Sequence, residues 1–315
     1  MLWWLPTALA FDQEVVTLVW APYDNDLAFA LDDILDAAIG SAPATVQSDG
    51  PGPHGMKRTV YTHDSILGIG VDDDDSASIE AFRDFLAWAG EHYEAERYVV
   101  AILDHGGRVG ELARDDAPAG WLDTAEVGQA LRDFQAAEPG RIGLVVLQVC
   151  TKATLEAAYD LRGAADELLA SATAVAAPNP WFGPYDAGPL APQVVARMPR
   201  DKWVQWTCLV PAAASELPAR LPPALTVDTD ALAPRVWTYA GDAFVDLDAL
   251  QLDAAVRSWI DGELVCGSWQ SPAPDPRLTE GYPEGGARLG LWLPDDSLPV
   301  DLPALWQALA PAQSR

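Results

Sequence analysis

One histidine and one cysteine occupy positions at which an α/β protein can use them for catalysis. The apolar run Tyr98–Leu103 leads into Asp104 and His105, and the apolar run Ile142–Leu147 is closely followed by Cys150. Continuous apolar runs of this length predict buried parallel strands, and ligands bind beyond the carboxyl ends of such strands. If the two strands are neighbours, the histidine and the cysteine face each other across that edge of the sheet.

A facing cysteine and histidine can perform nucleophilic catalysis, because a thiolate attacks a carbonyl carbon while the imidazole moves the proton. The backbone N–H groups of Gly106 and Cys150 would then form an oxyanion hole. A helix predicted to start near Ala153 should lower the pKa of Cys150 through its dipole. Lys152 is expected either to lower that pKa further or to point into solvent. The alternative is that His105 and Cys150 are ordinary strand-end residues.

The remaining histidines and cysteines have less informative surroundings. His54 and His63 lie in or beside loop-like sequence, and His92 lies near a helix end. Cys208 and Cys266 are expected to be structural. Three cysteines are too few for a disulfide scaffold, and the absence of a CxxC motif argues against a structural zinc site. We therefore expect no metal site of this kind.

The elements that position His105 and Cys150 follow from hydrophobic periodicity. Strand and helix patterns alternate along the first half of the chain, which predicts an α/β fold with a mainly parallel sheet and helices on both faces. Ser41–Arg58 is rich in Gly, Pro and Ser and predicts a loop. The predicted strands are Val15–Trp20, Thr59–Thr62, Tyr98–Leu103 and Ile142–Leu147; the predicted helices are Asp26–Ile39, Ile79–Tyr93, Thr124–Ala137 and Ala153–Ala170.

Composition shifts beyond Pro178, where Pro and Trp become dense. We expect residues 1–14 to be a leader or an apolar N-terminus, residues 15–195 to form the catalytic core, and residues 196–315 to form an extension of the sheet or a second lobe. The later segments predict a strand at Trp203–Val210, a linker at Pro211–Pro223, a helix at Leu247–Ile260 and a strand at Arg288–Pro294.

The overall charge excludes some partners. With 19 Lys+Arg against 47 Asp+Glu, the 315 residues carry a formal charge of −28 at pH 7. Such a field repels phosphate backbones and anionic membranes, so we expect no nucleic acid partner and assign the charge to solubility. Half of the residues are apolar, which is enough for a large core. No apolar run is long enough to cross a membrane, and we expect a monomer.

The segment Met1–Ala10 is apolar and ends in Ala8-Leu9-Ala10, the small-x-small pattern of a signal-peptidase site, although it lacks a basic start. We therefore expect a periplasmic or secreted protein, with the cytoplasm as the alternative. The acidic run Asp72–Asp75 has no EF-hand spacing around it and predicts a solvated turn at a helix N-terminus.

Several of these motifs together resemble the clostripain-like family of the caspase, gingipain and legumain clan of cysteine peptidases. The His-Gly block and the Cys block occur in the family's order, and the likeness spans about Val15 to Asp186. The matching motifs are Val15–Trp20 with Asp24-Asn25-Asp26-Leu27, Asp104-His105-Gly106-Gly107, Cys150 with the helix segment Ala153–Arg162, Trp181–Asp186, and Gly290–Pro294.

The resemblance implies a caspase-like three-layer sandwich and a cysteine endopeptidase. It implies Cys150 as the nucleophile, His105 as the general base or acid, and a peptide or protein as the substrate, cleaved through an acyl-enzyme. No cofactor is implied, and Ca²⁺ dependence is left open.

The sequence departs from the family at the substrate pocket. Family members cleave after basic residues and have an Asp two positions before the Cys, whereas this chain has Gln148, which is similar to the caspase block. A neutral amide cannot supply the charge that holds a P1 arginine, so basic specificity would require another acid, for which Asp186 is the candidate. Two alternatives follow: a caspase-like peptidase with acidic or neutral P1 preference, and a catalytically silent binding or scaffold protein of this fold.

Overall fold

A computed structural model describes residues 11–39, 43–50, 55–62, 65–72, 75–221, 224–225, 232–293 and 300–301. Residues 1–10 of the expected leader or apolar N-terminus, His54, His63 and half of the Asp72–Asp75 run lie outside these residues, whereas residues 11–14 belong to the first strand. Among the helices in the described part of the chain, none combines the length and the apolarity that a membrane span requires.

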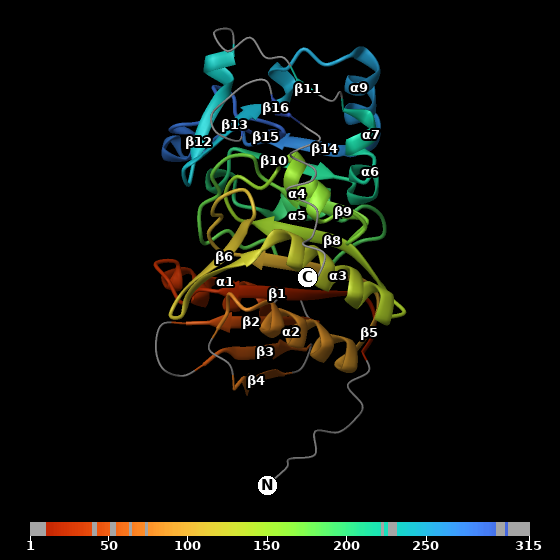
Figure 1. Cartoon of the computed structure of the whole chain (residues 1–315). Helices are drawn as coiled ribbons and strands as arrows, with labels where there is room; N and C mark the ends of the chain where they lie inside the picture. Colours follow the sequence, from red (N-terminus) through yellow and green to blue (C-terminus); the bar gives the residue numbers. More distant parts are fainter. Residues whose placement is uncertain are drawn as a thin grey trace, which may run out of the picture.

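The centre of the molecule is a nine-stranded sheet with the order β14-β10-β9-β8-β5-β1-β2-β3-β4 (Figure 1). Its five middle strands are parallel to one another. They are β1 (Phe11–Pro22), β2 (Ala44–Asp49), β5 (Tyr93–Leu103), β8 (Arg141–Gln148) and β9 (Glu167–Ala170). The apolar runs in three of them, β1, β5 and β8, predict this arrangement.

Antiparallel strands extend this sheet at both edges. On one side lie β3 (Lys57–Tyr61) and β4 (Ile66–Gly70), and on the other β10 (Gln205–Leu209) and β14 (Val265–Gln270). The C-terminal part of the chain therefore continues the sheet. A disulfide between Cys208 and Cys266 joins β10 to β14, which leaves Cys150 as the free cysteine.

Three small sheets complete the strands. The hairpin of β6 and β7 comes next after β5 along the chain. Strands β12, β13 and β15 form a three-stranded sheet at the end of the molecule opposite β4 (Figure 1). Their bounds are β6 (Glu111–Asp116), β7 (Ala119–Asp123), β12 (Val236–Tyr239), β13 (Asp242–Asp246) and β15 (Gly290–Leu293), with the pair β11 (Ala224–Leu225) and β16 (Val300–Asp301).

Helices cover both faces of the large sheet, and each face has its own core. Strand residues alternate between the two: Val100 and Ile102 pack on one face, Val99 and Ala101 on the other. The first face carries α2 (Ile79–His92), α3 (Thr124–Ala137) and α4 (Leu155–Asp160); the second carries α1 (Leu31–Ala38) and α5 (Ala191–Arg197). The predicted α/β fold, mainly parallel with helices on both faces, is confirmed.

Local departures from the expected elements have identifiable causes. The predicted loop Ser41–Arg58 contains β2, whose burial between β1 and β3 overrides the neighbouring Gly and Pro. The predicted helix Ala153–Ala170 is wrong beyond Asp160, because a turn with Gly163 at φ 70° leads into β9.

Two further predictions differ from the structure at helix starts. The predicted linker Pro211–Pro223 contains α6 (Pro211–Ala214) and α7 (Leu217–Arg220), each with a proline in its first turn, where the ring is compatible with a helix. The predicted helix Leu247–Ile260 begins only at α9 (Ala254–Trp259), where Asp253 caps it, and continues into a π turn, Ile260–Leu264.

Candidate active site

The loops that follow β5 and β8 touch at the carboxyl edge of the sheet. Leu103 pairs with Gln148 in the parallel register, and His105 and Cys150 each follow two residues later. A Cβ on Gly106 would lie 2.1 Å from the carbonyl oxygen of Cys150, so this contact requires glycine. The fold thus brings the two predicted chemical residues onto adjacent strand ends.

His105 is held by an acidic residue from a third strand end. Its Nε2 lies 2.7 Å from Oδ1 of Asp26, in the loop after β1, and the imidazole is 27% exposed. The hydrogen bond to His105 is the main cause that lowers the pKa of Asp26. Asp26 belongs to the motif Asp24-Asn25-Asp26-Leu27, for which the sequence predicted no catalytic role. Its position after a parallel strand, like those of His105 and Cys150, is the signal that identifies it.

Buried polar contacts fix the loop that carries Asp26. Asn25 donates from Nδ2 to Oδ1 of Asp104 (2.9 Å) and accepts from the N–H of Leu27 (2.8 Å). Oδ2 of Asp104 accepts from the N–H of Arg114 (2.6 Å). Burial raises the pKa of Asp104 well above its usual value. These contacts tie Asp104, directly before His105, and Arg114 in β6 to the loop after β1.

The Cys150 thiol is enclosed rather than activated in this structure. It contacts the backbone of Val175, from whose N–H it accepts (3.5 Å) and to whose carbonyl it donates (3.7 Å). Burial raises its pKa, so the predicted lowering is wrong. The cause is that α4 begins only at Leu155, too far along the chain for its dipole to act at Cys150. The thiol and the His105 ring, both within the described chain, are not hydrogen-bonded to each other.

Lys152 points inward instead of into solvent. Its side chain is fully buried, and Nζ donates to the carbonyl oxygens of Gly107 (3.2 Å) and Arg108 (2.5 Å). Burial lowers the pKa of Lys152 to about 8. The ammonium lowers the pKa of Cys150, which was one of the two expected roles, but the effect of burial is larger. Its larger structural role is to anchor the loop that follows His105.

The two expected oxyanion donors lie in contact with each other. The hydrogen bonds within the described part of the chain use neither the N–H of Gly106 nor that of Cys150. The carbonyl of His105, which shares a peptide plane with the Gly106 N–H, accepts from Ala113 (3.1 Å). This bond fixes the plane and leaves the Gly106 N–H available to a ligand.

The two predicted pocket residues, Gln148 and Asp186, have different surroundings. Gln148 is 5% exposed, and its Oε1 accepts from the indole N–H of Trp181 (2.8 Å). Asp186 is exposed, and its N–H donates to Oε1 of Gln193 on α5 (2.8 Å). None of the contacts recorded for Asp186 within the described chain involves His105, Cys150 or Gln148. Within the described chain, no hydrogen bond or ion pair therefore joins Asp186 to this site.

Sequence reasoning missed Asn179, which lies in the segment between Val175 and Trp181. One end of this segment touches the Cys150 thiol and the other holds Gln148. Asn179 is fully buried, and neither atom of its amide has a hydrogen-bond partner among the described residues. A lone Asn near a proline carries no sequence signal for such a position.

A group of carboxylates near the Asp26 loop has the donor chemistry of a cation site. One oxygen each from Asp24, Asp49 and Asp115 lies within 4.8 Å of the others. Burial, followed by the charge of Asp115, raises the pKa of Asp49 to about 6. Three oxygen donors suit hard cations such as Ca²⁺ or Mg²⁺. Asp115 already accepts hydrogen bonds from Ser76 (2.7 and 2.8 Å) and Ala117 (2.7 Å).

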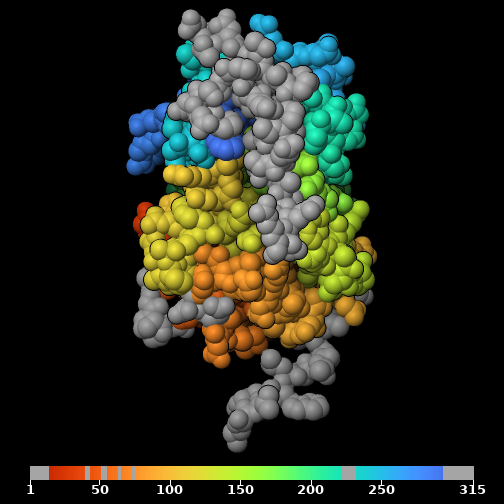
Figure 2. Space-filling model, viewed as in Figure 1, coloured from red at the N-terminus to blue at the C-terminus, as the bar shows by residue number. Residues whose placement is uncertain are grey.

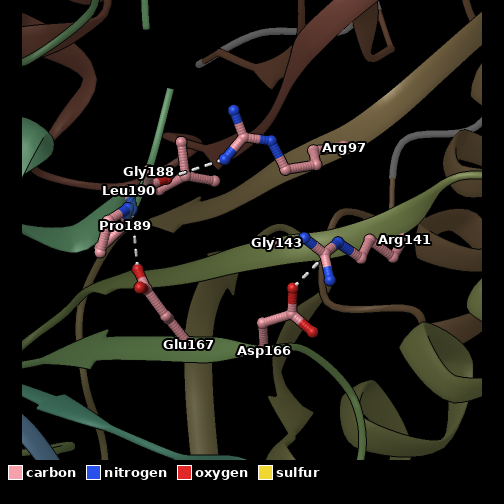
Figure 3. A pocket seen from close by; sticks show the side chains of 8 residues that line it. All are labelled: Arg97, Arg141, Gly143, Asp166, Glu167, Gly188, Pro189 and Leu190. Carbon is pink, nitrogen blue, oxygen red and sulfur yellow. Dashed lines mark hydrogen bonds and ion pairs between the residues drawn. The ribbon is translucent and has the colours of Figure 1, made fainter. Parts of the chain in front are cut away.

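A surface pocket lies at the opposite edge of the sheet (Figure 3). Its walls include Arg97 on β5, Arg141 at the start of β8, and Asp166 and Glu167 at the start of β9. Arg141 pairs with Asp166 (3.2 Å), while Glu167 accepts from the N–H groups of Leu190 (3.0 Å) and neighbouring Ala191. Because these strands are parallel, this pocket is at their amino ends, away from His105 and Cys150.

Comparison with known proteins confirms the resemblance. Residues 56–181 match the profile of the Clostripain family. The chain is also similar to a secreted C11 cysteine protease from Bacteroides thetaiotaomicron, solved with an irreversible peptide inhibitor: TM-score 0.68, 14% identity, 94% of this chain and 97% of that one covered. A search of curated proteins gives no significant match.

A second solved structure agrees. It is an inactive zymogen C11 protease from Parabacteroides distasonis, with TM-score 0.65, 17% identity and 94% of each chain covered. These relationships confirm the predicted caspase-like fold. The profile match over residues 56–181 supports the predicted class of cysteine-type peptidase.

Proposed function

We propose, from the confirmed likeness to clostripain-family cysteine peptidases, that this chain is an endopeptidase with Cys150 as nucleophile and His105 as proton carrier. The observation that carries the proposal is the contact of the two strand-end loops, in which Gly106 packs against the Cys150 backbone. Nucleophile, proton carrier and two oxyanion donors then all belong to one edge of the sheet, and the chemical step needs no cofactor.

In the proposed first half-reaction, the Cys150 sulfur gives its proton to His105 and attacks the carbonyl carbon of the scissile peptide. The N–H groups of Gly106 and Cys150 donate to the developing oxyanion. The carbon–nitrogen bond then breaks, and the protonated His105 gives its proton to the leaving amine. Asp26 holds the imidazole during both transfers. The product is a thioester on Cys150 and a free amine.

In the second half-reaction, His105 takes a proton from a water molecule, and the oxygen of that water attacks the thioester carbonyl. The carbon–sulfur bond breaks, the acid product forms, and the proton returns to the sulfur. Because burial raises the thiol pKa in this structure, we propose that substrate must displace the Val175 contacts before the thiolate is reactive.

We propose a neutral P1 residue for the substrate. Gln148 is bound to Trp181, the nearby Asn179 is also an amide, and Asp186 has no contact with either in the described chain. A basic P1 side chain would bury its charge here without a carboxylate, which is costly. This supports a caspase-fold peptidase with altered specificity over an arginine-specific one.

Acyloxymethyl ketone probes bearing P1 Arg, Lys, Asp or Gln test the proposal directly. We expect an adduct on Cys150 in the wild type, strongest with the Gln probe, and none in Cys150→Ala or His105→Ala. Intact-mass analysis detects the adduct, and peptide mapping after proteolysis locates it. If no probe labels the folded wild type with or without Ca²⁺, the alternative of a catalytically silent binding protein is correct.

We also propose that the protein works outside the cytoplasm. The Cys208–Cys266 disulfide supports this, since such bonds persist in oxidising compartments, and one structural neighbour is described as secreted. Counting free thiols in protein isolated from its native source tests the location. One free thiol per chain agrees with export, and three contradict it.

A further inference from the structure

The hairpin of β12 and β13 reaches the active-site loop from the far end of the chain. Its two-residue turn, Ala240 and Gly241, has φ angles of 51° and 89°, the left-handed pair typical of a tight hairpin. Tyr239 and Asp242 pair directly across this turn. Figure 2 shows the C-terminal segments, in cyan and blue, seated on the yellow and green middle of the chain.

Both side chains at this turn bind the loop that follows His105. The Tyr239 hydroxyl donates to the carbonyl oxygen of Gly106 (2.9 Å), and Oδ2 of Asp242 accepts from the N–H of Val109 (2.8 Å). Lys152 holds the carbonyls of the two residues between them. The loop is therefore fixed at successive residues by groups from β12, β13 and the loop after β8.

The contact with Gly106 matters because of where that residue lies. The carbonyl before it accepts from Ala113 and its own carbonyl accepts from Tyr239, so the peptide groups on both sides of Gly106 are fixed. Between them is the N–H assigned to the oxyanion hole, in contact with the Cys150 backbone. Preorganised donors stabilise a transition state more than freely rotating ones.

We infer that the β12–β13 hairpin is part of the active site and that Tyr239 is a positioning residue, which fixes the Gly106 peptide beside Cys150. This inference rests on the proposed peptidase function. The Tyr239 hydroxyl has one proton, which it donates to the Gly106 carbonyl; a shift of that proton toward the Cys150 sulfur on ionisation would favour the thiolate and lower the thiol pKa against the effect of burial. The C-terminal part of the chain thus contributes directly to the chemistry of a core some 90 residues earlier.

Tyr239→Phe removes one hydroxyl and keeps the ring. We expect kcat for a peptide substrate to fall about tenfold, the equivalent of one hydrogen bond, while KM changes less than about twofold, because oxyanion donors act mainly in the transition state. Tyr61→Phe, an identical change on the distant strand β3, is the control and should match the wild type. Asp242→Ala should also lower kcat, by loosening the same loop at Val109.

A second measurement does not depend on turnover. Cys150 is the free thiol, so its alkylation by iodoacetamide across a pH series reports its own ionisation. We expect the midpoint to rise in Tyr239→Phe and to stay unchanged in Tyr61→Phe. Folded Tyr239→Phe protein with wild-type kcat and midpoint would overturn the inference. Absence of probe labelling in the wild type would instead reject the peptidase, and the alkylation midpoint would still test Tyr239.

Discussion

At the scale of single residues, the imidazole of His105 is hydrogen-bonded to Asp26, whose side chain is mostly exposed to solvent. The Asp26 side chain is 77% exposed, yet it lies 2.7 Å from the His105 ring. An exposed ion pair contributes little to stability, so we assign this contact to orientation of the ring. The Asn25–Asp104 hydrogen bond next to it supplies the rigidity that an exposed carboxylate lacks.

Asp26→Ala should therefore reduce catalysis without unfolding the protein. Removal of a general acid–base costs about 10²–10⁴ in rate, and loss of only its orienting partner should cost less, roughly tenfold in kcat. We expect Tm to change by less than about 2 °C, as for an exposed pair. Steady-state kinetics and thermal unfolding of this variant check both expectations. Asp166→Ala, which removes the partner of the exposed Arg141 at the amino ends of the strands, is the matched control.

Sequence could identify His105 and Cys150 because each directly follows an apolar strand, and Gly106 because a glycine there permits close approach. It could not identify the phenol of Tyr239 or the amide of Asn179, since both are brought to the site by segments whose paths depend on tertiary packing. It misjudged the thiol pKa for a related reason: burial by the distant Val175 segment outweighs any local helix dipole.

At the scale of elements, the site is made by the ends of three adjacent parallel strands. β1, β5 and β8 are neighbours, and their following loops supply Asp26, His105 and Cys150. The alternation of strand and helix patterns predicted a parallel sheet but left the adjacency of the His105 and Cys150 strands conditional, and it did not place β1 beside them. α3 has the predicted bounds because Asp123 caps its start. β2 was missed because six buried residues between Gly- and Pro-rich segments carry too little periodicity.

The contact between the β5 and β8 loops predicts the effect of Gly106→Ala. The added Cβ would lie 2.1 Å from a backbone oxygen, so the loops must separate. We expect a loss of about 1–3 kcal/mol in the free energy of unfolding and loss of probe labelling at Cys150. Gly70→Ala on β4, where a Cβ meets no atom within 4 Å, should leave both measurements unchanged. Normal labelling of Gly106→Ala would show that the two loops need not touch.

At the scale of the whole molecule, buried carboxylates determine the pH dependence of stability. Burial raises the pKa of Asp49 to about 6 and those of Glu156 and Asp160 to about 7. Their unfolded values are near 4, so between about pH 4 and 7 the native state binds more protons than the unfolded state. The free energy of unfolding therefore falls as pH rises through this window.

Thermal unfolding at pH 5 and pH 8 should thus give the higher Tm at pH 5, with 0.5 M salt to screen the net charge of −28. Glu156→Gln keeps an oxygen for the N–H of Trp292, its present donor (3.0 Å), and removes one titration. We expect this variant to gain roughly 1–3 kcal/mol at pH 8 and nothing at pH 4. A Tm that rises from pH 5 to pH 8 would contradict the assignment.

The disulfide between β10 and β14 places opposite demands on any reducing agent. In the proposed mechanism Cys150 must be kept reduced to attack a carbonyl, whereas Cys208 and Cys266 must stay oxidised to keep β10 and β14 joined. With two of three cysteines in that bond, Cys150 has no free thiol in its own chain to form a protective disulfide. Oxidants therefore convert it to sulfenic acid, which added thiols can reduce, and then to sulfinic acid, which they cannot. Recovery of activity therefore depends on small thiols from outside, at concentrations too low to open the bond between the strands.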